Sequence, residues 1–160
     1  MPWLLKGAVV VEDPWIEVAD DAPLPAAHAL ISFVRWQSLV PGETLPSPLG
    51  VVLEPEQDVR ALAPSLAGLD LVALRFPKFT DGRPSSRARL LRERYGFQGE
   101  IRAIGDILVD QLQMLRRCGF DSFLLADSQS PELAQAELER FTVHFQPGAD
   151  GHHPLRARRF

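Results

Sequence analysis

The chain has 160 residues, of which 46% are hydrophobic and 24% are charged, and it contains one cysteine. A chain of this size and composition fits one globular domain that buries a core. Its formal net charge of -4 argues against a nucleic-acid partner, because a phosphate-binding surface needs a basic excess. With Cys118 alone, the sequence excludes an intrachain disulfide, a CxxC redox pair and a cysteine cluster for zinc or iron–sulfur.

The N-terminal third is rich in proline, which excludes long helices there. Its first apolar run, within MPWLLKGAVVVEDPW, is too short and too polar for a signal peptide or a membrane span. We therefore expect a cytoplasmic protein with no membrane partner. Short strands are predicted at 8–11 and at 15–18, the second pairing back on the first. The apolar run at 29–36 is too short to distinguish a strand from a short helix, and of the two a strand is favoured. Residues 1–48 are predicted to form a β arm laid on the main sheet.

From residue 49 the pattern changes to alternating strands and helices. Strands are predicted at 50–53, 71–76, 100–104 and 122–125, and helices at 58–66, 87–95, 107–118 and from Ser130 onward. Such strand–helix units imply parallel strands joined by right-handed crossovers. We predict an α/β fold with a mainly parallel sheet in a three-layer α/β/α arrangement of about four βα units. The alternative, a (βα)4 half-barrel, has the same local pattern.

The chain is predicted to be a single domain over 1–160. Within it, the arm at 1–48 precedes a βα-repeat core at 49–146, and a flexible tail occupies 147–160. A final edge strand is expected at 143–145.

Charged residues and glycines gather where the predicted core strands end. Those that follow the second, third and fourth strands are Lys78, Asp81, Arg83, Gly105, Asp106, Asp127 and Ser128. The carboxyl ends of parallel strands share one edge of a sheet, where such folds bind ligands. Arg83 and Arg87 also lie near the expected start of a helix, where main-chain N–H groups favour an anion. We predict ligand or anion binding by Lys78, Asp81, Arg83, Arg87 and Gly105. A turn at Asp81 and a solvated face for the arginines explain the same residues more simply.

Asp106 and Asp110 are the candidate catalytic pair, since they lie four residues apart on a predicted helix. Repulsion at this spacing would raise the pKa of one carboxyl and create a general acid and a general base. Two simpler roles stay open: Asp106 as the N-cap of that helix, and an arginine partner for either carboxylate.

The other candidate groups form no known motif. The histidines do not fall into a metal-ligand spacing with acidic residues, so no metal site is predicted. Cys118 is expected to be a half-buried, inert thiol. The chain has no GxGxxG, P-loop or nucleophile elbow. No nicotinamide, ATP or flavin motif is recognised, and the cofactor is left unknown.

Three long blocks of the sequence are similar to a known family. They are FPKFTDGR at 76–83, ARLLRERYGFQGEIRAIGDILVDQ at 88–111 and RRCGFDSF at 116–123. On these blocks the chain resembles the bacterial domain of unknown function 934 family over most of residues 5–146. It departs from the family at Pro84-Ser85, where a glycine and an aromatic residue are usual, and at Gln113-Met114, where aromatic residues are frequent. A pocket shaped by these positions would differ in this member.

The resemblance implies a role beside sulfite reduction, because the family is described as a probable oxidoreductase or accessory component of that pathway. We predict an accessory protein of assimilatory sulfite reduction that acts with the sulfite reductase system, with a sulfite reductase subunit as its partner. The alternative is an oxidoreductase or anion-processing enzyme that binds a small sulfur oxyanion or a nucleotide at the strand-end loops. A third hypothesis is a structural subunit without a ligand. Whether the protein is an enzyme stays open.

Overall fold

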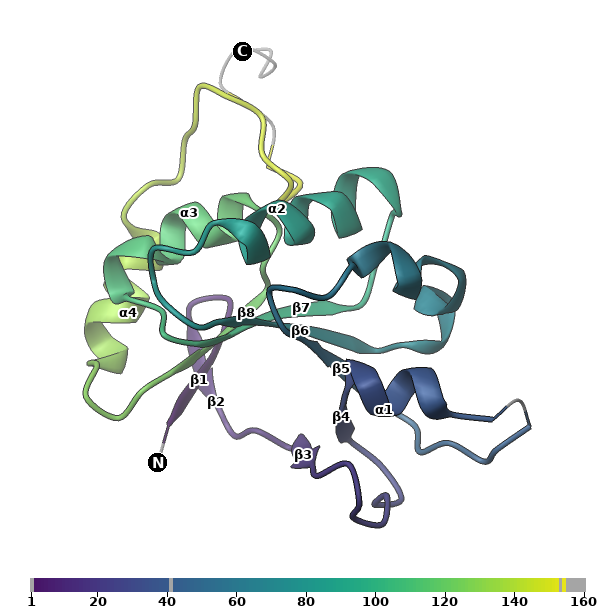
Figure 1. Cartoon of the computed structure of the whole chain (residues 1–160). Coiled ribbons are helices and arrows are strands. Elements are labelled where there is room, and N and C mark those ends of the chain that lie inside the picture. The colour runs from purple at the N-terminus through teal and green to yellow at the C-terminus, as the bar shows by residue number, and fades with distance from the viewer. Residues whose placement is uncertain (1, 41, 153, 155–160) are drawn as a thin grey trace.

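The computed structural model describes residues 2–40, 42–152 and 154, and within them eight strands form one sheet (Figure 1). The strands are β1 (Trp3–Lys6), β2 (Val9–Val11), β3 (Ile16–Val18), β4 (Ala29–Ser32), β5 (Leu49–Leu53), β6 (Leu71–Phe76), β7 (Glu100–Gly105) and β8 (Ser122–Leu125). Their order across the sheet is β2-β1-β8-β7-β6-β5-β4-β3. From β3 to β8 neighbouring strands are parallel, whereas β1 is antiparallel to both β2 and β8.

The predicted three-layer arrangement is wrong. Each strand from β3 to β7 lies beside the strand that follows it in the chain. Right-handed crossovers between sequential neighbours all leave the sheet on the same side. The helices therefore cover one face, and the sheet curls as a half-barrel with a mixed edge (Figure 1). Both arrangements fit the sequence because hydrophobic periodicity identifies strands and helices but not the order of the strands.

The N-terminal third is part of this sheet and is not an arm laid upon it. The strands β1 and β2 form one edge, and β3 and β4 extend the parallel strands at the other. The strand β1 was not predicted, and β3 pairs with β4 rather than back on β2. The strand predicted at 29–36 ends at Ser32, whose Oγ accepts a hydrogen bond from the main-chain N–H of Arg35 at 3.0 Å and so caps a helix.

The helical segments are short, and several are not α-helical. They are α1 (Phe33–Ser38), the 3-10 helix η1 (Val59–Gly68), α2 (Arg83–Arg89), the π-helical turn η2 (Leu90–Arg94), the 3-10 turn η3 (Val109–Gln111), α3 (Leu112–Arg117) and α4 (Pro131–Glu139). The helix predicted at 87–95 begins earlier, because Pro84 suits a first helical turn. At the start of α4, Ser130 Oγ accepts from the N–H of Leu133 at 3.2 Å. In the part of the chain that the structure describes, helices of the length and apolarity that a bilayer crossing requires are absent.

Two predictions concern the C-terminal end. Residues 143–145 were expected to form an edge strand, but they adopt no regular structure. Of the tail predicted at 147–160, residue 153 and residues 155–160 lie outside the described residues.

Alternate residues of each strand face opposite sides of the sheet, as the pleat requires. On β6, Val72, Leu74 and Phe76 join the main core beneath the helices, whereas Leu71 and Ala73 join a smaller apolar cluster on the inner side. This arrangement explains the near-continuous apolar runs in the sequence, because strands covered on both faces need apolar residues at nearly every position.

The inner side of the sheet is covered by the segment between β2 and β3, which passes on the side away from α2 and α3 (Figure 1). Trp15 packs against the inner apolar cluster, and a Cβ on Gly50 would lie 3.1 Å from its ring. Arg102, only 1% exposed, donates to Glu100 and to Asp13 of this segment, the latter at 2.8 Å. An ion pair from a buried arginine to a partly exposed aspartate therefore fixes the crossing segment to the sheet.

Candidate functional site

The loops after β6 and β7 are joined by polar contacts at the carboxyl edge of the sheet. Asp106 Oδ2 accepts from the main-chain N–H of Phe79 at 3.1 Å, and Gln111 Nε2 donates to the carbonyl oxygen of Phe79 at 2.8 Å. Asp106 thus fixes the neighbouring loop and does not cap the helix that follows it. The aromatic ring of Phe79 is held half-exposed at this edge.

Asp81 and Arg83 form a close ion pair in the loop before α2. The Arg83 guanidinium donates to both carboxylate oxygens of Asp81, with Nη2 at 2.7 Å from Oδ2, and also lies 3.4 Å from Glu56. Hydrogen bonds from the side chain and main chain of Arg83 lower the pKa of Asp81 to about 2. Asp81 therefore stays ionised at neutral pH, and Arg83 is partly neutralised.

Arg87 joins α2 to the loop after β5 with a guanidinium that has no carboxylate partner among the described residues. Its Nε donates to the carbonyl oxygen of Gln57 at 3.0 Å, and its Nη2 donates to that of Pro55. Burial, followed by the like charge of Arg83, lowers the pKa of Arg87. With Arg60 and Arg83 it lines a hollow of about 620 Å³ between η1 and α2.

Three other predicted residues do not line this hollow. Asp110 lies exposed in η3, while Asp106 lies in the loop before it, so the two carboxylates do not lie one turn apart on a continuous helix. Lys78 is exposed, and its side chain makes no ion pair within the described ranges. The structure thus brings Asp81, Arg83 and Arg87 together and leaves Lys78 and the pair of Asp106 and Asp110 apart from them.

Gly105 has a main-chain role. Its φ is +93°, and a Cβ at this position would lie 2.3 Å from the carbonyl oxygen of Phe76 on the adjacent strand. Only glycine fits this conformation beside β6. The same close approach lets the N–H of Asp106 donate to that carbonyl at 2.8 Å.

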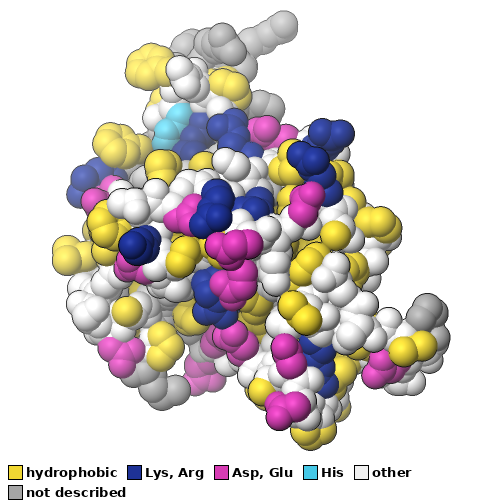
Figure 2. Space-filling view, viewed as in Figure 1, with side chains coloured by type: hydrophobic (Ala, Val, Ile, Leu, Met, Phe, Trp, Pro, Cys, Tyr) yellow, Lys and Arg dark blue, Asp and Glu magenta, His cyan; other side chains and the backbone are white. Residues whose placement is uncertain are grey.

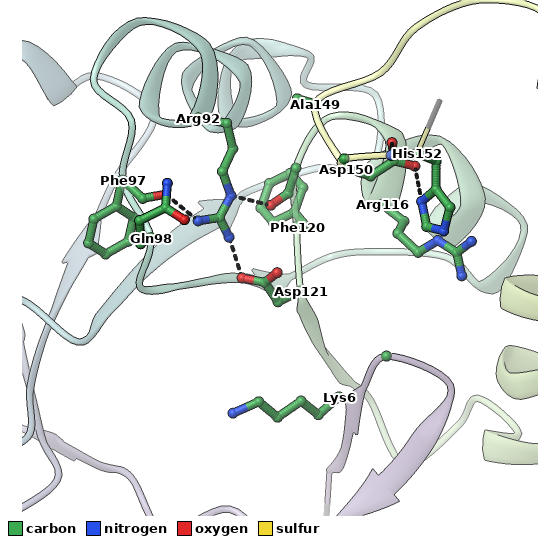
Figure 3. A pocket seen from close by; sticks show the side chains of 13 residues that line it. Lys6, Arg92, Phe97, Gln98, Arg116, Phe120, Asp121, Ala149, Asp150 and His152 are labelled. Carbon is green, nitrogen blue, oxygen red and sulfur yellow. Dashed lines mark hydrogen bonds and ion pairs between the residues drawn. The ribbon is translucent and has the colours of Figure 1, made fainter. Parts of the chain in front are cut away.

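A larger cavity of about 690 Å³ lies at the opposite edge, near the amino ends of β7 and β8 (Figure 3). Its walls come from the turn after β1, from η2 and the loop after it, from α3 and the loop after it, and from residues 149–152. Sequence reasoning missed this cavity because it attends to the carboxyl ends of strands. The signal that could have indicated it is Gly119 followed two residues later by Asp121, directly before the strand β8.

Arg92 is the structural centre of that cavity's inner wall (Figure 3). Its guanidinium donates to the carbonyl oxygens of Phe97, Gly99 and Gly119 and pairs with Asp121. Asp121 Oδ2 in turn accepts from the N–H of Ile101 at 2.9 Å. Arg92 belongs to the helix predicted at 87–95, and it joins the loop before β7 to the loop before β8.

The cysteine and the histidines do not form a shared site with one another in the described part of the chain. Burial raises the pKa of the Cys118 thiol, which keeps it protonated near neutral pH. Burial, followed by the charge of Arg117, lowers the pKa of His144, whereas His152 Nδ1 lies 3.2 Å from Asp150. Within residues 2–40, 42–152 and 154, a group of three or more histidine, cysteine, aspartate or glutamate side chains placed to hold a metal ion is absent. His153 lies outside the described residues.

Comparisons with known proteins give one match. The model of a family described as bacterial protein of unknown function (DUF934) matches residues 50–156. This range includes the strands from β6 to β8, nearly all of β5, and the helices that line the hollow and the larger cavity. Neither a curated protein nor a solved structure matches the chain. Because the match covers well over half of the sequence, the chain belongs to this DUF934 family.

Proposed function

We propose that this protein is an accessory protein of assimilatory sulfite reduction and acts by direct contact with the sulfite reductase system. The resemblance of three long sequence blocks to a family described in that setting supports the pathway. The proposal of a contact rests on one structural observation, an exposed apolar surface next to the C-terminal helix.

Three alternate residues after α4 expose large apolar side chains. Phe141, Val143 and Phe145, which we call the apolar strip, are 55%, 43% and 80% exposed. Leu133 on α4 and Met114 on α3 are also exposed on these two packed helices. Figure 2 shows hydrophobic side chains projecting from the upper left of the molecule, where Figure 1 places the segment after α4.

One side chain of α3 holds both the end of α4 and the first residue of the strip by their main-chain carbonyl groups. Gln113 Nε2 of α3 donates to the carbonyl oxygen of Leu138 at 2.7 Å and lies 3.5 Å from that of Phe141. A segment that is anchored by its main chain while its apolar side chains point to solvent is typical of a protein-binding surface. Aromatic residues are also the side chains that contribute most at such interfaces.

Gel filtration of the purified chain with sulfite reductase at micromolar concentration tests the proposal. We expect the two to elute together, and we expect a variant carrying Phe141→Ser and Phe145→Ser to elute separately. Val34→Ser is the matched control, since Val34 on α1 is 59% exposed and lies outside the strip. Separate elution of the unaltered proteins would contradict the proposal.

A second candidate function is an enzyme that processes an anion in the hollow between η1 and α2. The observation that favours it is the Arg87 guanidinium, which has no carboxylate partner in the described part of the chain and shares this hollow with Arg60 and Arg83. Guanidinium groups bind oxyanions through paired hydrogen bonds. A thermal-shift screen against sulfite, sulfate, phosphate and nucleotides, repeated on Arg83→Ala, tests it. A shift that the variant loses supports this function, and no shift with any of these compounds excludes it.

A further inference from the structure

The outer wall of the 690 Å³ cavity is a specific structure built around Arg117. Its Nη1 donates to both oxygens of Asp150, its Nη2 donates to the carbonyl oxygen of Gln146, and its own carbonyl oxygen accepts from the N–H of Ala149 at 2.8 Å. A Cβ on Gly148 would lie 2.6 Å from the Arg117 guanidinium carbon, so glycine allows the chain to pass against it. These contacts hold residues 149–152 over the cavity.

The carboxylates in the cavity wall are already neutralised. Asp121 pairs with Arg92. Asp150 is paired with Arg117 and is next to His152. An anion entering the cavity therefore meets carboxylates whose charge is compensated by adjacent cations, and the repulsion it experiences is small.

Among the described residues that line this wall, Arg116 is the cation that lacks a counter-ion. Its Nη1 donates to the carbonyl oxygen of Leu138 at 3.0 Å, and its Nε is buried without a hydrogen-bond partner among the described residues. Salt bridges to Arg116 are also absent in that part of the chain, although the side chain lines the cavity. That Nε is enclosed and out of a ligand's reach, but Arg116 Nη2 makes no hydrogen bond within the described residues. An anion oxygen is the acceptor that best satisfies such a guanidinium donor.

Two further donors are available around the same cavity. His152 Nδ1 contacts Asp150, so in the protonated ring Nε2 carries a hydrogen that it can donate to a ligand, and Figure 3 shows the ring on the same side of the cavity as Arg116. Lys6 approaches from β1, where its amino group is 2.8 Å from Glu100 and keeps further N–H donors. Besides Arg116, the cavity wall thus carries two further basic side chains that are close to a carboxylate and keep a face toward the cavity lining.

We propose that this cavity binds a tetrahedral oxyanion, of the phosphate or sulfate type, through Arg116 and His152. The cavity is larger than an inorganic ion, so the oxyanion is one group of a larger molecule, and Lys6 meets another part of that molecule. This inference is independent of the proposed contact with sulfite reductase and of the hollow near Arg87.

Isothermal titration calorimetry with sodium sulfate and sodium phosphate, at an ionic strength held constant with sodium chloride, tests the site. We expect both ions to bind the full chain, and Arg116→Gln to weaken binding by at least about tenfold, the cost of one charge-assisted hydrogen bond. Arg94→Gln removes an exposed arginine of η2 and is the matched control, which we expect to bind as the unaltered protein does.

A second variant separates loss of binding from loss of folding. His152→Asn alters an exposed side chain, and we expect it to weaken binding severalfold at an unchanged unfolding midpoint. The absence of heat with both ions would overturn the proposal. Binding that survives in both Arg116→Gln and His152→Asn but is lost in Arg87→Gln would also overturn it, since the ligand would then occupy the hollow between η1 and α2.

Discussion

Arg117 Nη1 lies 2.7 and 2.9 Å from the two carboxylate oxygens of Asp150, and this pair joins the segment after the apolar strip to α3. Burial alone would raise the pKa of Asp150, but the hydrogen bonds from Arg117 and from the N–H of His152 lower it by more. We expect Asp150→Ala to reduce the free energy of unfolding by about 2 kcal/mol, because it leaves a charged donor without its acceptor. Urea unfolding measures the change.

An exposed ion pair provides the control for this prediction. Arg89 and Glu93 of α2 and η2 are 3.1 Å apart, and both side chains are about half exposed. Solvent screening makes such pairs worth little, so Glu93→Ala should change stability far less than Asp150→Ala. Equal losses in the two variants would show that Asp150 has no special role in holding the segment.

Because of Glu100, we expect the free energy of unfolding to decrease at acid pH. Burial raises its pKa, but hydrogen bonds from Lys6 and Ser122 and the charge of Arg102 lower it by more, so the pKa is below its usual value. The stabilisation is therefore complete above the unfolded-state pKa of about 4.3 and is lost as pH falls through the lower folded-state pKa. Thermal unfolding midpoints measured at successively lower pH should stay level from pH 7 to about pH 4.3 and should decrease at lower pH.

Glu100→Gln should make the free energy of unfolding depend less on pH in the acid range. It should also lower stability at neutral pH, because Arg102 would lose the charge of a buried partner. Glu139→Gln, at an exposed position of α4, is the control. A decrease at acid pH that persists unchanged in Glu100→Gln would assign the pH dependence to other groups.

Gly105 is predicted to be required for folding. Gly105→Ala places a Cβ against the Phe76 carbonyl in a left-handed conformation, and we expect it to cost at least about 2 kcal/mol of unfolding free energy. Gly82→Ala is the matched control, since its φ is -83° and a Cβ there meets nothing within 4 Å. Thermal denaturation compares them, and a fully stable Gly105→Ala protein would refute the main-chain role.

The two arginines near α2 should differ in their effect on stability. Arg87→Ala removes a guanidinium that joins the carbonyl groups of two residues after β5, and we expect a loss of about 1–2 kcal/mol. Arg83→Ala removes an exposed side chain paired with Asp81 and should leave the unfolding midpoint nearly unchanged. Differential scanning calorimetry measures both losses. A larger loss of stability in Arg83→Ala than in Arg87→Ala would show that Arg83, and not Arg87, is the arginine that stabilises the fold.

The sequence predicted local elements where one short-range signal was sufficient. The bounds of β6 and β8 agree with the predicted strands at 71–76 and 122–125, because continuous apolar runs ended by polar residues and glycine define buried strands. The helix predicted from Ser130 onward is α4, whose N-cap is Ser130 and whose first residue is Pro131. Strand order was not predictable in this way, since it depends on contacts between residues far apart in the chain.

The sequence predicted which candidate side chains lie together better than it predicted what each of them does. Asp81, Arg83 and Arg87 do lie together, because the start of α2 brings them to one edge of the sheet. The role of Asp106 depends on Phe79, 27 residues away in the chain, and that contact has no local signature. The larger cavity depends on residues 149–152 folding back on α3, which again is a long-range contact.

The most direct test of the proposed function is isothermal titration calorimetry of this protein against purified sulfite reductase. We expect saturable binding at micromolar concentration for the unaltered chain and for the Val34→Ser control. The variant with Phe141→Ser and Phe145→Ser should bind at least about tenfold more weakly, as is typical when buried aromatic anchors are lost. No heat of binding with the unaltered chain, or equal affinity in the strip variant, would contradict the proposal.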